Sequence, residues 1–515
     1  MTVLLGRRMP AVVVATASLV FSAALAVVAL ATPVAAADAG DAARLANAAH
    51  LANGANAANA NAANLANLAG VERAANAYRP PAVGGVYPGY RLALAAPRLV
   101  VCAKDSESRI DRLSPATRTL NEGLLAECSH HDLQKAVDAV WRRGTTIYVL
   151  PGRYRATAVS VVGDGTPGCA RCDLQLEGTG DRAADVVLDG GFTRSGDWAR
   201  RVGVYAERAN GLYVRNLTAQ HYSGAAFEIN WTDGFILDNV TGRWNGSYGV
   251  TATGDDHGVI DGCTVTGNGT AGIATAPVAT VGGTRTTVEV RRCRSHGNLV
   301  GYVGGDSVYV HDNDISGNAV GITGGGGAGQ RHGSFIANRV YDNNANPYGN
   351  VWSGRCAEPP RDRDGDVLCP ATAVPVGTGL VLSAGQQNTF AGNLIYDNWR
   401  AGASQLGYAR GNRWMGNLMG IGPAGTAAPN GLDFWWDRTG ERNCWQDNAS
   451  SWGAIRSDPP ALPDCAHPSG AGVGIPTWQT ISACASYVPA SADRPKGVRP
   501  EGCPWLDTPA RPAPR

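Results

Sequence analysis

The chain has 515 residues, of which 67 are glycine, so it is too long for one compact core and too glycine-rich for a helical protein. Its 44 basic and 43 acidic side chains nearly cancel, which argues against nucleic acid or an anionic membrane as a partner. The only lysines are Lys104, Lys135 and Lys496, so the basic residues between positions 136 and 495 that stay charged at neutral pH are all arginines.

The first residues predict export. Arg7 and Arg8 precede an apolar run over about residues 10–32, and Ala35-Ala36-Ala37 offers the small residues that a signal peptidase recognises. We therefore expect residues 1–37 to be a signal peptide, the mature protein to be secreted, and no membrane association after cleavage. A retained anchor is the alternative, because the apolar run is long enough to span a bilayer.

Residues 38–84 follow the predicted cleavage site, and their middle part contains almost only Asn and Ala. Repeated Asn competes for backbone hydrogen bonds, and the segment has no steady apolar face. The composition therefore predicts a flexible spacer.

Twelve cysteines in an exported chain indicate disulfides. Nearest neighbours in the sequence are the candidate pairs: Cys102 with Cys128, Cys169 with Cys172, Cys356 with Cys369, Cys444 with Cys465, and Cys484 with Cys503. A four-cysteine zinc site would need a second CxxC motif, and the sequence has none. Cys263 and Cys293 occupy equivalent places in neighbouring repeats, so they form either a stacked buried pair or a disulfide.

Residues 130–143 predict an amphipathic helix, because Leu133, Ala136, Val137 and Val140 fall on one helical face. A predicted strand follows, which ends in Pro151-Gly152.

From about residue 214 a unit of roughly 23 residues recurs, and each unit carries short strands in which apolar and polar residues alternate. The later strand of each unit follows a glycine, as in Tyr248-Gly249-Val250-Thr251-Ala252-Thr253. No unit has a long helical segment, so the period predicts an all-β solenoid of about ten coils over residues 85–465. Residues 466–515 are rich in proline and predict a disulfide-stapled cap or tail.

This pattern resembles the right-handed parallel β-helix, or pectin-lyase-like, superfamily. In that superfamily a helix covers the open N-terminal end of the stack, as residues 130–143 are placed to do, and such a cap protects an exposed sheet edge. Asn216, Asn239, Asn338 and Asn393 fall near one corner of successive coils, where stacked Asn side chains form hydrogen bonds along the rod.

Relatives that act on polysaccharides use the groove beside one sheet. If the glycine-led strands form that sheet, Phe227 and Ile229 point inward, while Glu228, Asn230, Thr251 and Thr253 point outward. The following turns carry Asp233 in one coil and Asp255-Asp256-His257 in the next, and Asp306 holds a similar place later. Carboxylates one coil apart would form an acid and base pair; the alternative is that these aspartates only form turns.

The order Thr232-Asp233-Gly234, then Gly254-Asp255-Asp256, resembles the first two catalytic motifs of the polygalacturonase family. That resemblance implies an inverting hydrolase in which Asp255 or Asp256 is the general acid. The chain departs from the family at its later motifs: His257 lies in a different coil from the family histidine, and no lysine lies in the coils that follow. A polysaccharide lyase is the other enzymatic reading.

Two further groups are candidates for binding. Asp362, Asp364 and Asp366 alternate between Cys356 and Cys369, so they predict either a Ca²⁺ loop or a solvated acidic loop. Trp435 and Trp436 are adjacent, so one ring faces outward and would stack on a sugar, unless both close the end of the rod.

The sequence therefore predicts a secreted, monomeric β-helix protein that engages extracellular polysaccharide along one sheet, as a hydrolase or a lyase. The alternative is a non-catalytic adhesion or scaffold protein of the cell surface.

Overall fold

The computed structural model describes residues 62–79, 89–90, 97–155, 157–164, 166, 168–191, 201–255, 257–276, 287–304, 306–324, 331–345, 374–472, 474, 477–484 and 503–513. The predicted signal peptide, Asp256, the acidic loop with Asp362, Asp364 and Asp366, and the pair Cys356 and Cys369 lie outside these residues.

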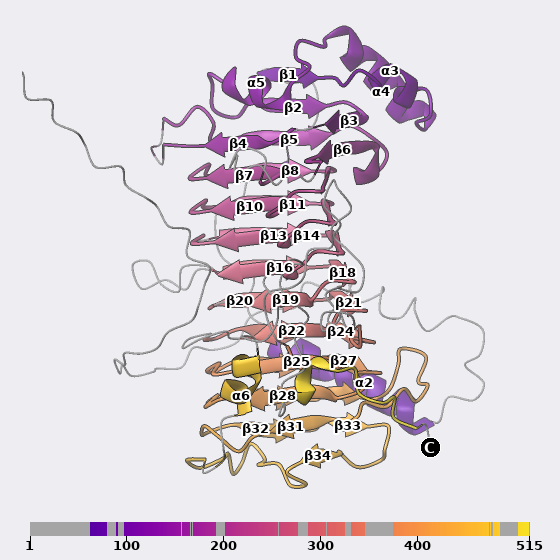
Figure 1. The fold of residues 1–515 in the computed structure, drawn as a ribbon, viewed down its shortest axis with the longest axis vertical. Coiled ribbons are helices and arrows are strands. Elements are labelled where there is room, and N and C mark those ends of the chain that lie inside the picture. The colour runs from indigo at the N-terminus through magenta and orange to yellow at the C-terminus, as the bar shows by residue number, and fades with distance from the viewer. Residues whose placement is uncertain are drawn as a thin grey trace, which may run out of the picture.

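The described chain coils through three parallel sheets, which stack into one elongated rod (Figure 1). Sheet A has 12 strands, and sheets B and C have 11 each. From residue 146 onward, strands that follow one another along the chain lie in different sheets, and each pairs with its equivalent in the next coil. The predicted all-β parallel β-helix is confirmed.

The strands are short, as the alternating pattern predicted. Sheet A contains β1 (Arg98–Val101), β2 (Thr146–Val149), β5 (Gln175–Gly178), β8 (Tyr213–Arg215), β11 (Phe235–Asp238), β14 (His257–Asp261), β17 (Thr287–Arg291), β20 (Val308–His311), β23 (Ser334–Ile336), β26 (Thr389–Ala391), β29 (Arg413–Met415) and β32 (Cys444–Gln446). Sheet B contains β3 (Gly152–Arg155), β6 (Val186–Asp189), β9 (Thr218–Gln220), β12 (Thr241–Arg243), β15 (Thr264–Thr266), β18 (Arg294–His296), β21 (Asp314–Ser316), β24 (Arg339–Tyr341), β27 (Leu394–Tyr396), β30 (Leu418–Met419) and β33 (Ala449–Ser450).

Sheet C contains β4 (Val159–Val162), β7 (Val204–Glu207), β10 (Phe227–Asn230), β13 (Tyr248–Thr253), β16 (Ala271–Ala276), β19 (Val300–Gly304), β22 (Val320–Gly324), β25 (Thr378–Ser383), β28 (Ala401–Leu406), β31 (Phe434–Trp436) and β34 (Ser457–Asp458). Its strands are the glycine-led ones, so sheet C is the sheet on which the sequence placed the groove.

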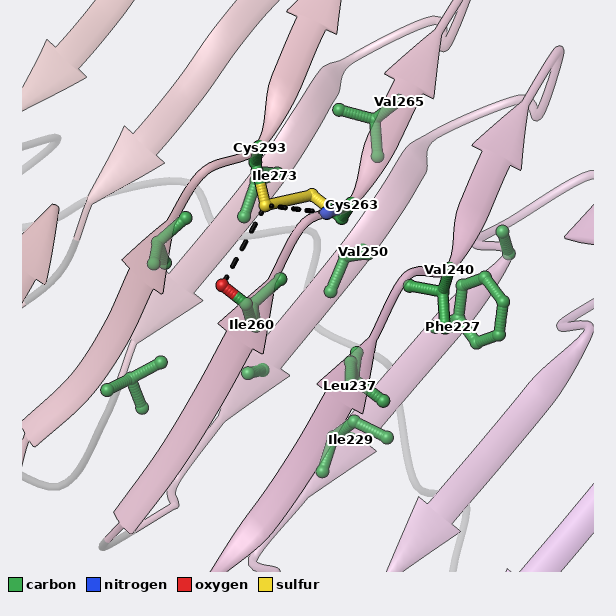
Figure 2. Packing of buried hydrophobic residues seen from close by; sticks show 14 of the residues in the cluster. Phe227, Ile229, Leu237, Val240, Val250, Ile260, Cys263, Val265, Ile273 and Cys293 are labelled. Carbon is green, nitrogen blue, oxygen red and sulfur yellow. Dashed lines mark hydrogen bonds between the residues drawn. A yellow bond between two sulfur atoms is a disulfide. The ribbon is translucent and has the colours of Figure 1, made fainter. Parts of the chain in front are cut away.

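The core runs along the inside of the rod and is built from inward residues of equal register. Phe227 pairs with Val250 and Ile229 with Ala252, and all four side chains are buried as predicted. Cys263 and Cys293 form a disulfide between neighbouring coils, which decides between the two alternatives for this pair (Figure 2). Aromatic rings stack further along the rod, where the ring centroids of Phe390 and Trp414 lie 4.0 Å apart.

Asparagine ladders hold the corners. Asn239 donates its side-chain amide to the side chain of Asn216 at 2.9 Å, and Asn338 donates to Asn393 at 3.1 Å, in the predicted corner between sheets A and B. A second ladder, which the sequence did not reveal, follows sheet B and consists of Asn245, Asn268, Asn298, Asn318, Asn343, Asn398 and Asn430. Each side chain in this second ladder bonds to the next coil, so the buried amides are satisfied.

Helices cover the N-terminal end of the rod. Helix α5 (Leu133–Asp138) lies inside the predicted range, and its residues Leu133, Ala136 and Val137 are fully buried in the main core. The Asp132 side chain caps this helix by accepting a hydrogen bond from the backbone of Lys135. Helices α3 (Ser106–Ile110) and α4 (Pro115–Ala126) were not predicted; their residues Ile110 and Leu124 are buried with Val100 of β1 and Tyr148 of β2.

Helix α2 (Ala62–Tyr78) corrects the prediction of a flexible spacer for its part of residues 38–84. Ala75 is buried against a small cluster on the outer face of sheet A that contains Tyr309, Ile336, Ala391 and Met415. Gly392 and Gly416 make room for the helix, since a Cβ at either position would come within 2.6 Å of Ala75 or Ala74. Alanine in this segment therefore serves close packing, a tertiary contact that composition does not reveal.

The C-terminal segment covers part of sheet C. Helix α6 (Thr477–Ala483) and the short helix Pro504–Leu506 are joined by the disulfide Cys484–Cys503. Ile481 packs with Val381 and Leu406 from the outer face of sheet C, so this face is buried at β25 and β28. The predicted pairs Cys102–Cys128, Cys169–Cys172 and Cys444–Cys465 are also present. No helix in the described part of the chain is long and apolar enough to cross a membrane.

Candidate functional site

The outer face of sheet C is open at β7, β10 and β13, which we call the open half. Burial alternates along β7 and β10, so Glu228 and Asn230 point outward as predicted. Register places Glu228 between Tyr205 and Thr251, and Asn230 between Glu207 and Thr253. Three adjacent strands therefore present two outward rows of polar side chains.

Tyr205 and Glu207 form one half of this site. The Tyr205 hydroxyl donates to a Glu207 carboxylate oxygen at 2.7 Å. Burial, and then the hydrogen bond to Glu207, raise the pKa of Tyr205 to about 12. Tyr205 therefore keeps its proton at neutral pH and acts as a hydrogen-bond donor, not as a base.

Glu228 and Asn230 form the other half. The Asn230 side-chain amide donates to a Glu228 carboxylate oxygen at 3.0 Å. Burial, and then the charge of Glu228, raise the pKa of Tyr248 in the next coil. The two carboxylates, Glu207 and Glu228, stand at diagonal positions on adjacent coils.

Sequence reasoning missed Tyr205 and Glu207. Their strand has the same alternation as β10 and precedes it by one period, since Val204 aligns with Phe227. The signal was present in the spacing, but the search for repeats began one strand later in the chain.

Asp233 and His257 come together at the corner between sheets C and A. The Nδ1 atom of His257 lies 2.6 Å from a carboxylate oxygen of Asp233, and the side chains are 22 % and 51 % exposed. Trp231, which is 57 % exposed, lies over Gly254 of the next coil, where a Cβ would come within 2.6 Å of its ring. The corner therefore offers an exposed carboxylate, an imidazole and an indole.

Asp255 is in a different environment from Asp233. Its side chain is fully buried, and one carboxylate oxygen accepts a hydrogen bond from the backbone of Thr232 at 2.6 Å. Asp255 thus holds the turn of the preceding coil, as the turn-forming alternative expects, and the two aspartates do not face a common surface. Asp256, which follows Asp255 in the sequence, is not among the described residues.

Asp306 lies in the turn between β19 and β20, at the same corner but in a later coil. Its carboxylate accepts a hydrogen bond from the backbone of Arg331, and burial raises its pKa. The outward residues of β10 and Asp306 are therefore separated by several coils at about 4.8 Å each, and the structure does not bring them together.

The prediction that Trp435 and Trp436 stack on a sugar is corrected by their surroundings. The Trp435 ring stacks on Trp505 of the C-terminal segment, with centroids 5.3 Å apart. Trp436 belongs to the main core and is 9 % exposed. Both rings are therefore used for packing, because the C-terminal segment covers this half of sheet C.

Metal binding was predicted for Asp362, Asp364 and Asp366, and this prediction remains untested. Within the described residues, the cluster with ligand atoms close enough for a metal ion is Cys102, Cys128 and His131. Its two sulfur atoms are joined in a disulfide, so it offers no thiolate.

Comparison with known proteins agrees with the fold. Residues 226–418 match a family model described as "Right handed beta helix region". No curated protein matches the chain. Similar solved structures include the mannuronan C-5 epimerase AlgE4 A-module of Azotobacter vinelandii, with 13 % identity over 60 % of this chain and 94 % of that chain and a TM-score of 0.35.

Two other similar structures have different names. The surface adhesin PfbA of Streptococcus pneumoniae has 11 % identity over 62 % of this chain and 86 % of that chain, with a TM-score of 0.38. A protein named glycoside hydrolase has 10 % identity over 70 % of this chain and 97 % of that chain, with a TM-score of 0.40. The three parallel sheets show that the chain has a parallel β-helix fold, which agrees with the family model matched by residues 226–418.

Proposed function

We propose that the protein binds an extracellular polysaccharide along the open half of sheet C and hydrolyses it there. The similar structures include an epimerase, an adhesin and a hydrolase, and at their TM-scores they carry no argument about activity. The proposal is therefore based on the side chains of this chain.

One observation carries the proposal: Tyr205, Glu207, Glu228 and Asn230 form two hydrogen-bonded pairs at the outward positions of adjacent strands. Carboxylate, amide and phenol groups are the partners that sugar hydroxyls require. Coils repeat about every 4.8 Å, and the two outward rows of side chains run along the rod. A glycan strand that follows the rod axis therefore lies along these rows.

Hydrolysis fits the site better than elimination. A lyase needs a base that abstracts the proton beside the uronate carboxyl, but Tyr205 holds its proton, and no lysine occurs between residues 136 and 495. A hydrolase needs two carboxyl groups, which Glu207 and Glu228 supply. We assign Glu207, which accepts a hydrogen bond from the Tyr205 hydroxyl and lies 3.7 Å from the Arg208 guanidinium, as the base that activates water. Glu228, whose partner is a neutral amide, is the proton donor.

A non-catalytic surface protein is the second candidate. The covered half of sheet C favours it, because the C-terminal segment leaves a short groove compared with the length of the rod. In this case the same residues bind the glycan and no bond is cleaved.

The test is to incubate the purified protein with a panel of neutral and uronate polysaccharides, with and without Ca²⁺. Reducing ends report hydrolysis, absorbance of unsaturated products reports elimination, and retention on immobilised glycan reports binding. We expect reducing ends from the wild type and from Glu441→Gln, a control at a distant coil, but not from Glu228→Gln. Unsaturated products would contradict the hydrolase, and binding without products would establish the second candidate.

A further inference from the structure

A second cluster of polar residues lies on the outer face of sheet B, around the same coils as the open half of sheet C. We call it the basic patch, and it consists of Arg153, Arg155, Asp189, Gln220, His221, Arg243, Trp244, Arg294 and His296. The arginines come from strands β3, β12 and β18, and the outward position of each strand is in register with the next.

Asp189 is the carboxylate at the centre of the patch, and its negative charge is already paired with neighbouring side chains. Its side chain is 4 % exposed and accepts hydrogen bonds from Arg153 Nε at 2.9 Å and Gln220 Nε2 at 3.0 Å. His221 Nδ1 lies 3.1 Å from its other oxygen. Burial alone would raise the pKa of Asp189, but these partners outweigh burial and hold the pKa well below its ordinary value.

Arg243 lies beside this group without a carboxylate of its own. Its Nε donates to Gln220 Oε1 at 2.8 Å, and it forms no ion pair within the described part of the chain. Burial, and then the charge of Arg153, lower the pKa of Arg243. Two guanidinium groups thus share one buried carboxylate, which leaves the patch with a net positive charge.

Trp244 keeps Arg243 in place. The guanidinium carbon of Arg243 lies 4.5 Å from the centroid of the Trp244 ring. The same ring stacks on His221 of the preceding coil and lies over Gly267 of the next one. The tryptophan, which is 36 % exposed, therefore positions the cation through a cation–π contact.

The positive charge continues along the rod. Arg294 and His296 are exposed at the outward positions of β18, and neither forms an ion pair with a described residue. Two coils after β18, on β24, the pattern changes, because Arg339 pairs with Asp314. The unbalanced charge is therefore confined to the N-terminal coils of sheet B.

We propose that the basic patch binds the anionic groups of an acidic polysaccharide, independently of the hydrolytic site on sheet C. Guanidinium groups suit carboxylate and sulfate oxygens, and arginines at several places along the rod, on β3, β12 and β18, suit a polymer with repeated charges. Nucleic acid fits less well, because the whole chain has a net charge of only +1.

The experiment measures binding of polygalacturonate oligomers, their methyl esters and sulfated oligomers of equal length, at low and high salt. We expect Arg243→Gln and Arg294→Gln each to weaken binding of the unesterified oligomer by about tenfold at low salt, because each removes a charge-assisted contact. High salt weakens wild-type binding in the same way. Sulfated oligomers show whether carboxylate or any anionic group is recognised.

Arg339→Gln is the matched control, since Arg339 is already paired on the same sheet. Glu228→Gln separates the two sites, because it should leave binding of the acidic oligomer at the basic patch unchanged even if the hydrolase proposal fails. The proposal is overturned if the exposed variant Arg294→Gln and the variant Arg243→Gln both bind like Arg339→Gln. Equal affinity for the methyl ester, or tighter binding of duplex DNA that both variants abolish, would also overturn it.

Discussion

The open half of sheet C and the basic patch of sheet B are built on the same backbone repeat but have opposite chemistry. The first presents Glu207 and Glu228 with a phenol and an amide, and the second presents Arg153 and Arg243 near one buried carboxylate, with Arg294 further along the rod. The whole-chain balance of 44 basic and 43 acidic residues conceals this separation. In a β-helix the inward residues determine the coil, so the outward residues of each sheet are free to take a different function.

The largest expected effect concerns the acidic site. Glu228→Gln keeps the shape of the side chain but removes its proton-donating carboxyl, so we expect the rate of hydrolysis to fall at least about 100-fold. Glycan retention should change little, because the amide still forms hydrogen bonds. Initial rates of reducing-end formation measure the effect, and a rate within threefold of the wild type would move the chemistry away from Glu228.

The next effect concerns the stability of the basic patch. Asp189→Asn leaves Arg153 without its buried anionic partner, so we expect the free energy of unfolding to fall by about 3 kcal/mol. Denaturant unfolding followed by circular dichroism measures the change. Asp181→Asn is the control, because the exposed Asp181 carboxylate accepts a hydrogen bond from Ser114. An equal loss of unfolding free energy in both variants would contradict the special role of Asp189.

The same carboxylate predicts a dependence on pH. Because its folded-state pKa lies well below the ordinary value near 3.9, the stability it contributes is fully present above about pH 4. That stability is lost as the pH falls through the folded-state pKa. Unfolding midpoints between pH 7 and strong acid should therefore fall more for the wild type than for Asp189→Asn.

A smaller effect concerns the partner of Glu207. Tyr205→Phe removes the hydroxyl that donates to Glu207 while keeping the ring, so we expect a fivefold to tenfold lower rate of hydrolysis, in line with the loss of about 1 kcal/mol. An unchanged rate would exclude Tyr205 from the site.

The smallest effect concerns the corner pair. Asp233→Asn removes the charge that faces His257, yet the exposed pair lies beyond the outward rows of β7 and β10. We expect a change of less than threefold in the rate of hydrolysis. A loss comparable to that of Glu228→Gln would place the catalytic acid at the corner and restore the interpretation drawn from the polygalacturonase-like motifs.

The fold was predictable because its determinants are periodic. One period predicts which residues of β10 and β13 face inward, and the register of Phe227 with Val250 follows from it. The disulfides between sequence neighbours were predictable for a different reason, because the short chain segment between two cysteines brings them close together. Helix α2 was not predictable, because it is stabilised by contacts with coils more than 200 residues away.

The candidate sites were only partly predictable. Glu228 and Asn230 follow from alternation alone, but Asp255 shows that an aspartate at a corner can point inward to a backbone amide. The basic patch went unrecognised, because Arg153, Asp189 and Arg243 are 36 to 90 residues apart in sequence and show no shared motif. Their proximity arises from the stacking of coils. Asp189 and Arg243 are in register through Gln220, and Arg153 reaches Asp189 from a diagonal position on the adjacent strand.

The contact between Arg79 and Asp312, at the end of helix α2, joins chain segments 233 residues apart. A solenoid otherwise has contacts only between adjacent coils, so local unfolding can begin at either end and spread one coil at a time. A helix that lies across the strands from β20 to β29 makes several coils open together. Proteolysis of the segment that precedes the coils should therefore loosen coils in the C-terminal half of the rod, far along the chain from the cleavage point.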